Sequence, residues 1–137
     1  MSDTIKWSFS ADRLFRRCQR QYFLTQIAAY HSAKDEVRRE AFLCKQVKTL
    51  ELWQGSLIHT GIERFVAPAW QQRRSVDWRV ATEDTKKLAR RQLAFAAARR
   101  YREEGMTKTK AGDDYCALVG HESNVGIGDE EFRTVLD

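Results

Sequence analysis

The stretch "WQGSLIHTGIERF", residues 53–65, is the segment on which the prediction of the fold depends. Its larger apolar residues recur at helical spacing and share one face: Leu57, Ile58, Ile62 and Phe65. This pattern predicts an amphipathic helix over residues 53–67, which Pro68 would end. His59 and Glu63 stand four residues apart on that helix, so their side chains can reach a common ion or partner. The spacing alone leaves two interpretations open, a surface pair or part of a functional site.

Two further helices are expected upstream of this segment. Residues 11–28 carry apolar side chains at helical spacing after Ser8 or Ser10, either of which is a suitable N-cap. Residues 33–50 repeat the pattern after Ser32. The first predicted helix also carries a basic stripe with an aromatic neighbour: Arg13, Arg16, Arg17, Arg20 and Tyr22. Arginines neutralise phosphates and aromatic rings stack on unpaired bases, so the stripe is a candidate nucleic-acid surface, although a solvated helix face explains the charges equally well.

A long fourth helix is predicted downstream, over residues 82–104, with Thr82 as its cap and Gly105 as its stop. Residues 106–114 are expected to form an exposed linker. The C-terminal sequence "GDEEFRTVLD" has the pattern of the opening turns of a helix capped by Asp129. The chain stops inside that pattern, which favours either a short terminal helix or a fragment of a longer protein.

The composition is that of a single domain, or part of one, and not of a membrane protein. With 137 residues, of which 42% are hydrophobic and 31% charged, the chain is long enough to bury a core. No apolar run approaches the roughly 20 residues needed to cross a bilayer, and the N-terminus lacks the basic-then-apolar layout of a signal peptide. A cytoplasmic protein without membrane association is expected.

The formal net charge of +5 is unevenly distributed along the chain. Residues 1–110, the predicted basic helical domain, carry +11, whereas residues 111–137 form an acidic C-terminal segment with −6. The positive field of residues 1–110 attracts a polyanion such as DNA or RNA. Such a field raises the rate of encounter and the strength of attraction, but it does not provide sequence specificity. A nucleic acid is therefore the partner that the charge favours.

The cysteines and acidic residues give little independent support for a catalytic site. Three cysteines at wide spacing, Cys18, Cys44 and Cys116, outline no disulfide framework and no CxxC metal knuckle. Cys18 and Cys44 fall on apolar faces and are predicted to be core residues. Asp84 and Lys86 match the D-x-K half of a metal-nuclease motif, but they fall in the first turn of a predicted helix, where an acid has a capping role.

The sequences "WSFSADRLFRRCQRQYFL" and "WQGSLIHTGIERF" follow each other at a separation of about 40 residues. Together they resemble the opening of RecB-like PD-(D/E)XK nucleases, where a serine-capped helix with a cysteine, a basic residue and aromatics precedes a helix with a glycine, a histidine and a later glutamate. The sequence "YCALVGHESNVGIGDEEF" is similar to the segment before the catalytic core in longer members. Each motif alone is degenerate, but the ordered pair is moderately specific.

The resemblance implies the helical N-terminal region of a restriction-endonuclease-like nuclease, with roles for particular residues. His59 matches the family histidine that helps to bind the catalytic divalent ion, usually Mg²⁺ or Mn²⁺, and Glu63 lies where that helix often carries a supporting acid. Cys18 matches the first cysteine of a [4Fe–4S] cluster in CRISPR-associated and AddB-type exonucleases. The chain departs from the family because it has no strand-borne acid followed by D/E-x-K and no C-terminal cysteine trio.

The resulting hypothesis is a mainly α-helical chain that binds DNA and contributes His59 to a metal site, with the α/β core absent. The core would come from the rest of the nuclease or from a partner subunit, so the isolated chain is not expected to cut. The alternative is a non-catalytic helical module that binds nucleic acid or protein. A structural protein that packs on a partner is a third interpretation.

Overall fold

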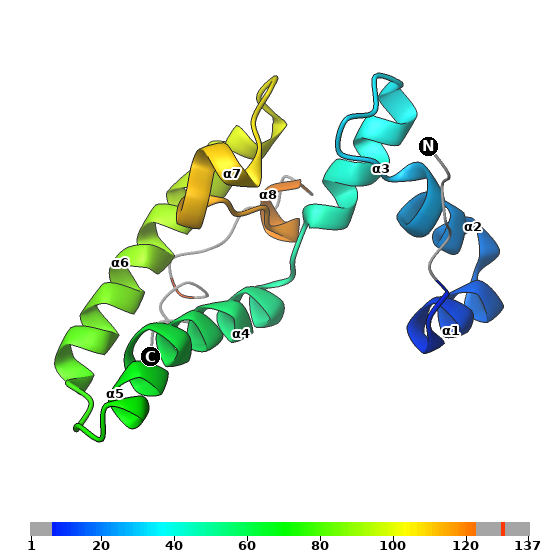
Figure 1. Ribbon diagram of the computed structural model, residues 1–137. Helices are drawn as coiled ribbons and strands as arrows, with labels where there is room; N and C mark the ends of the chain where they lie inside the picture. Colours follow the sequence, from blue (N-terminus) through cyan, green and yellow to red (C-terminus); the bar gives the residue numbers. More distant parts are fainter. Residues whose placement is uncertain (1–6, 123–129, 131–137) are drawn as a thin grey trace. The chain divides into compact units, whose positions relative to one another are not determined.

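The computed structural model describes residues 7–122 and residue 130, and Figure 1 shows them as a succession of helices. Within these residues no strand is present, so the prediction of a mainly α-helical chain is confirmed. The structure divides into two compact units, Met1–Gln46 and Val47–Asp137, and each is described by itself. None of the helices in the described part is long and apolar enough to cross a membrane.

The first unit opens with a helical stretch that is interrupted at Cys18. Ser8 caps it, because its side-chain oxygen accepts a hydrogen bond from the Ala11 N–H at 3.2 Å. At Cys18 the backbone becomes extended, and the Sγ atom accepts a hydrogen bond from the Gln21 N–H at 3.4 Å. The continuous helix predicted over residues 11–28 is therefore wrong, since Cys18 ends one helix and caps the next. The elements are α1 (Phe9–Arg17), α2 (Gln19–Tyr22) and the π-helical segment η1 (Phe23–Ala28).

Helix α3, Glu36–Gln46, completes the first unit. Its N-terminus lies after Asp35, whose Oδ1 atom accepts a hydrogen bond from the Arg38 N–H at 2.9 Å, and the predicted cap Ser32 lies in a turn outside the helix. The Arg38 side chain donates to the Ala28 carbonyl at 3.1 Å and so joins α3 to the end of η1. Few residues of this unit are fully buried: Ala11, Tyr22, Ala28 and Leu43.

The second unit begins with a longer helical run than the sequence predicted. Thr49 caps it, because Oγ1 accepts a hydrogen bond from the Leu52 N–H at 3.3 Å. Pro68 does not end the run, because it lies in the first turn of a new helix, where its missing N–H is tolerated. A Cβ on Gly61 would lie 3.2 Å from Thr85 Oγ1, so glycine permits a close approach to the facing helix. The elements are α4 (Leu50–Gly61), the π-helical segment η2 (Ile62–Val66), α5 (Ala67–Gln71) and α6 (Trp78–Ala97).

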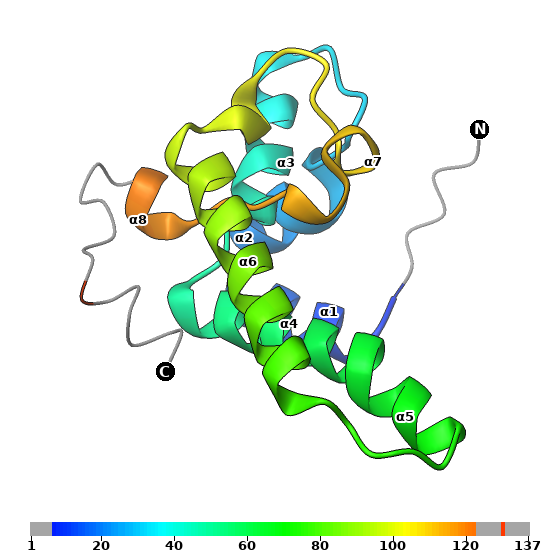
Figure 2. The same cartoon turned by 90° about the vertical axis from the view of Figure 1, so that its left-hand side faces the viewer.

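Helix α6 starts earlier and ends earlier than predicted. Asp77 caps it by accepting a hydrogen bond from the Val80 N–H at 3.1 Å, and the predicted cap Thr82 lies inside the first turns. Arg99 adopts a left-handed backbone (φ 51°) and turns the chain away before it reaches Gly105. Figures 1 and 2 show α6 running from the α5 end of the second unit toward α7.

The chain after α6 folds back onto the second unit. Lys48 N–H donates to the Ala117 carbonyl at 2.8 Å, and Val119 N–H donates to the Lys48 carbonyl at 3.0 Å. The exposed linker predicted over residues 106–114 is replaced by short helical elements, and the division predicted after residue 110 does not coincide with the observed one. The elements that follow α6 are the 3₁₀ turn η3 (Arg100–Arg102), α7 (Lys108–Ala111), the 3₁₀ turn η4 (Gly112–Asp114) and α8 (Val119–Glu122), of which α7 and η4 lie in the predicted linker.

The core of the second unit draws on α4, α6 and the returning segment. One buried cluster contains Trp53, Leu57, Leu88, Ala89, Ala96, Cys116 and Leu118, and a second contains Phe95, Tyr101 and Ala117. The returning segment is therefore part of the core and holds α4 and α6 together. The terminal helix predicted with Asp129 as its cap falls outside the described residues, except for Glu130.

Candidate functional site

His59 and Glu63 form an exposed pair at the junction of α4 and η2. His59 lies in the last turn of α4 and Glu63 in the first turn of η2. The His59 Nε2 and Glu63 Oε1 atoms are 3.1 Å apart, and the two side chains are 73% and 65% exposed. The helical spacing read from the sequence therefore does bring the two groups together. Both atoms are open to solvent, where a ligand from another segment could join them.

The described residues do not assemble a complete site for a divalent cation. Over residues 7–122 and 130, no group of three or more His, Cys, Asp or Glu side chains is placed to hold a metal ion. A Mg²⁺ or Mn²⁺ ion prefers several oxygen ligands together with water. His59 and Glu63 offer two ligands, so these residues fit part of a metal site and not the whole.

The three cysteines do not form an iron–sulfur site. Cys18 and Cys44 are exposed, which contradicts the prediction that they are core residues, and both line one groove of about 840 Å³ in the first unit. Cys116 is buried in the second unit, and burial raises its pKa to about 12. A [4Fe–4S] cluster takes four thiolates, whereas the chain contains three cysteines. The cysteines present do not fit the cluster that the resemblance implies for Cys18.

The four predicted nucleic-acid-binding arginines are exposed: Arg13, Arg16, Arg17 and Arg20. Two of them already contact neighbours on their own helical stretch, since Arg16 Nε lies 2.8 Å from Asp12 Oδ2 and Arg17 Nη2 lies 2.9 Å from Gln21 Oε1. Exposed side-chain contacts of this kind contribute little stability, so neither guanidinium group is held firmly by its neighbour. The stripe can therefore present its guanidinium groups to a polyanion.

The prediction that Tyr22 stacks on bases is not supported by its position. Tyr22 is only 5% exposed, and its ring packs edge-on against Phe15 with centroids 5.3 Å apart. Trp7 covers it at a centroid distance of 5.9 Å. Other aromatic side chains of the first unit remain exposed, among them Phe9 and Phe23, which sequence reasoning did not single out. Their signal was weak, because an exposed and a buried aromatic look alike in a short, interrupted helix.

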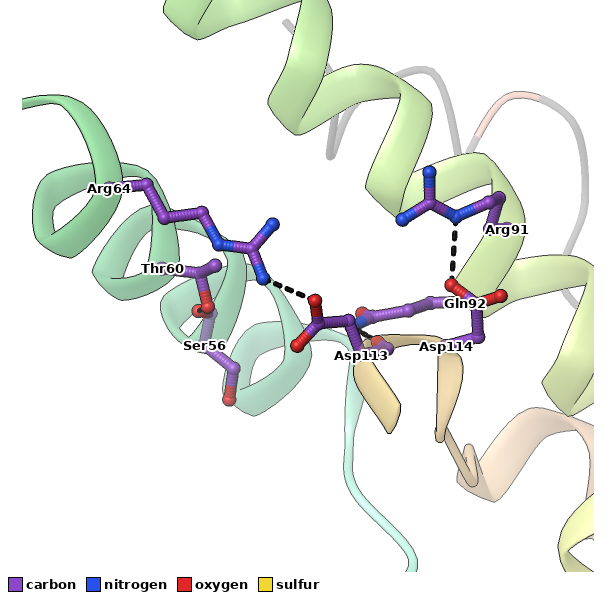
Figure 3. A network of polar contacts seen from close by, with 7 residues as sticks. All are labelled: Ser56, Thr60, Arg64, Arg91, Gln92, Asp113 and Asp114. Atoms are coloured by element: carbon purple, nitrogen blue, oxygen red, sulfur yellow. Dashed lines mark hydrogen bonds and ion pairs between the residues drawn. The ribbon is translucent and has the colours of Figure 1, made fainter. Parts of the chain in front are cut away.

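A second cationic cluster lies between η2, α6 and η4, and sequence reasoning missed it (Figure 3). Arg64 Nη2 donates to Asp113 Oδ2 at 2.6 Å, and Arg91 Nε donates to Asp114 Oδ1 at 2.8 Å. Figure 3 shows the two arginines reaching the acidic turn from different helical segments. The partners are 49 and 23 positions apart in the chain, so local spacing gave no signal for them.

Gln92 anchors the acidic turn independently of these ion pairs. Its Nε2 atom donates to the Asp113 carbonyl at 2.7 Å, and its Oε1 atom accepts from Trp53 Nε1 at 2.7 Å. Trp53 is itself one of the least exposed residues of the core. The turn η4 therefore has a fixed backbone position, which presents its two carboxylates to the arginines.

Glu122 is the centre of another polar cluster near the end of the described chain. Its two carboxylate oxygens accept from Arg102 Nε at 2.9 Å and Arg102 Nη2 at 2.7 Å, and Oε1 also accepts from the Tyr101 hydroxyl. Hydrogen bonds from Arg102 lower the pKa of Glu122 to about 2, whereas burial and Glu122 raise the pKa of Tyr101 to about 12. Burial, together with the charge of Arg99, lowers the pKa of His121. These contacts hold α8 against η3, so a structural role explains the polar cluster around Glu122.

A family model of the PD-(D/E)XK nuclease superfamily matches residues 6–133, which is most of the sequence. The chain belongs to the PD-(D/E)XK nuclease superfamily. No curated protein and no solved structure shows significant similarity to it. Superfamily membership, predicted from two ordered motifs, is thereby confirmed, and it indicates a nuclease-related function with a nucleic-acid substrate. Nucleases of this superfamily generally use divalent metal ions.

Proposed function

We propose that this chain is the DNA-binding helical portion of a RecB-like, metal-dependent PD-(D/E)XK nuclease and contributes His59 as one metal ligand. The match to the superfamily over residues 6–133 is the observation that carries the proposal. Glu63 has the supporting role, since it is the acid in contact with His59. The 3.1 Å between their ligating atoms suits two neighbouring positions on an octahedral ion, which lie about 3 Å apart when each bond is about 2.1 Å long.

The remaining ligands come, in this proposal, from the rest of the nuclease or from a partner subunit. The described residues offer no third His, Cys, Asp or Glu next to the pair, which supports a chain that does not cut alone. When bound in a complete site, a divalent ion activates water and stabilises the charge that develops on the phosphate. His59 presents its imidazole at the end of α4, and the exposed arginine stripe of α1 and α2 attracts the DNA backbone.

Cleavage assays on the isolated chain and on a longer polypeptide that adds the acid and lysine motifs test this proposal. With Mg²⁺ or Mn²⁺, the isolated chain should leave single-stranded and duplex DNA intact, whereas the longer polypeptide should cut. His59→Ala should remove that activity, and His31→Ala is the matched control because His31 is also exposed. Metal-dependent cleavage by the isolated chain would show that the assignment of the core is wrong.

A non-catalytic helical binding module is the second candidate, and the incomplete ligand set in the described residues favours it. In that case His59→Ala changes no measurable property of the longer polypeptide. Reversing the charges with Arg16→Glu and Arg17→Glu weakens nucleic-acid binding in both cases and flattens its dependence on salt. The response to His59→Ala, and not the arginine result, therefore separates the two candidates.

A further inference from the structure

We propose that Arg64, Lys87 and Arg91 form a second contact site for the DNA phosphate backbone, and that the acidic turn η4 occupies its arginines when DNA is not bound. The proposal rests on the DNA-binding function proposed above, and it adds a site and a competing internal anion in the second unit. It differs from the arginine stripe of the first unit in its residues and in its predicted response to acidic substitutions.

The geometry is that of an anion-binding hollow between two helical segments. A hollow of about 310 Å³ lies between α4 with η2 and α6, and its lining includes Thr60, Arg64, Lys87 and Arg91. Guanidinium groups present several N–H donors in a plane and bind carboxylates and phosphates in the same way. The hollow thus combines the two guanidinium groups of Arg64 and Arg91 with the ammonium group of Lys87. Its one acidic lining residue is Asp84. The Asp84 Oδ1 and Lys87 Nζ atoms are 3.8 Å apart, a long distance for an ion pair.

Asp113 and Asp114 take the place that a phosphate would take at the two guanidinium groups. The Arg64–Asp113 and Arg91–Asp114 distances are 2.6 and 2.8 Å, as in charge-assisted hydrogen bonds to an anion. All four side chains are between 42% and 63% exposed, so water competes for both pairs and neither is held tightly. A DNA strand, with a charge on every nucleotide, can therefore replace the carboxylates.

The backbone of η4 does not depend on the two ion pairs. Gln92 holds the Asp113 carbonyl, and the hydrophobic residues that follow the turn are part of the core. The carboxylates can consequently leave the arginines by side-chain rotation while the fold remains. The same anchoring makes Asp113→Asn and Asp114→Asn suitable test variants, because the contact made by Gln92 uses a main-chain atom.

The test measures the affinity of the full chain for a fluorescein-labelled oligonucleotide, single-stranded and duplex, by fluorescence anisotropy at several salt concentrations. Arg64→Gln with Arg91→Gln should weaken binding on the order of 30-fold near 0.1 M salt and flatten the salt slope by up to about 2. Asp113→Asn with Asp114→Asn should strengthen binding, on the order of tenfold, and steepen the slope. The two double variants thus act in opposite directions.

Matched controls separate competition from a general effect of net charge. Glu103→Gln with Glu104→Gln removes two exposed acids elsewhere, and Arg74→Gln with Arg79→Gln removes two exposed arginines of the same unit. Each should change affinity much less than its counterpart. When Arg64 and Arg91 have already been replaced, the two Asp→Asn changes should raise the DNA affinity no more than Glu103→Gln with Glu104→Gln does. The reason is that no arginine remains to be released from an aspartate.

Three outcomes would overturn the inference: both double variants changing affinity in the same direction, both matching their controls, or the Asp→Asn benefit persisting in the background without the arginines. If circular dichroism shows that the double variants are poorly folded, the single variants are measured instead. Arg64→Gln should then weaken DNA binding, and Asp113→Asn should strengthen it. A chain that binds DNA through Arg16 and Arg17 but fails these tests contradicts this inference alone. A chain that binds no DNA contradicts the proposed function as well.

Discussion

Replacing Glu122 by glutamine should destabilise the second unit, mainly under conditions in which the carboxylate is ionised. Glu122→Gln keeps the shape of the side chain but removes the charge that accepts two hydrogen bonds from Arg102 and one from Tyr101. The pKa of Glu122 falls from 4.5 to about 2, chiefly through Arg102, and each pKa unit corresponds to about 1.4 kcal/mol. The upper limit is therefore roughly 3.4 kcal/mol in the free energy of unfolding.

Solvent screening reduces this limit, since 24% of the Glu122 side chain is exposed. We expect a loss of about 1.5–2 kcal/mol near neutral pH, which corresponds to a melting temperature lower by roughly 10 °C for a unit of this size. The pKa is lower in the folded chain than in the unfolded one. The contribution of Glu122 is accordingly complete above its unfolded pKa of 4.5 and is lost as the pH falls toward about 2.

Thermal unfolding followed by circular dichroism, at neutral and acidic pH, measures the effect. Glu103→Gln is the matched control, because Glu103 makes only a 3.5 Å contact with Arg100 and both side chains are 52% exposed. That variant should lose no more than about 0.5 kcal/mol. Equal losses in the two variants, or a loss in Glu122→Gln that does not shrink on acidification, would refute the reasoning.

Three other predictions concern thiol reactivity, packing and capping. Alkylation of the folded chain should modify the exposed Cys18 and Cys44, whereas Cys116, with a pKa of about 12, should react only after unfolding; peptide mass spectrometry would show the order. Leu118→Ala should lower the free energy of unfolding by about 2–5 kcal/mol in denaturant titrations, and a loss under 1 kcal/mol would contradict its place in the core. Thr49→Ala should cost about 1 kcal/mol in the same titrations, and Thr49→Ser should restore most of it.

Apolar periodicity predicted that the helices exist, but it did not predict where they begin. The sequence pattern placed the cap of α6 at Thr82, next to the apolar stripe, and did not predict Asp77 as a cap. The structure uses Asp77, so Trp78 starts the helix although its side chain is 65% exposed. The extra helical turn buries only Ala81, whose small side chain adds little to an apolar pattern, and periodicity reports burial and not backbone conformation.

The acidic residues after α7 were mistaken for a linker because their partners are distant in the sequence. Composition showed that Asp113 and Asp114 are polar and follow a glycine, which is the usual pattern of an exposed loop. Their interaction with Arg64 and Arg91 depends on how η2, α6 and η4 pack, and no local rule contains that information. The same limit explains why the second cationic cluster was not predicted.

The candidate site was predictable where it depended on one helix and not where it depended on packing. His59 and Glu63 meet because helical geometry places residues four apart on the same side. Tyr22 carried two possible roles in the sequence, an apolar core position and an aromatic beside a basic stripe. The choice was settled by Trp7 and Phe15, whose rings cover it.

The contact between Lys48 and Leu118 has a consequence for synthesis of the chain on the ribosome. The residues that close the core, Cys116 and Leu118, are translated long after Trp53, with which they form one buried cluster. Until they emerge, the apolar faces of α4 and α6 lack a covering segment, and nascent chains with exposed apolar surface are prone to aggregate. The second unit is therefore expected to complete folding late, with chaperones binding α4 and α6 during the interval.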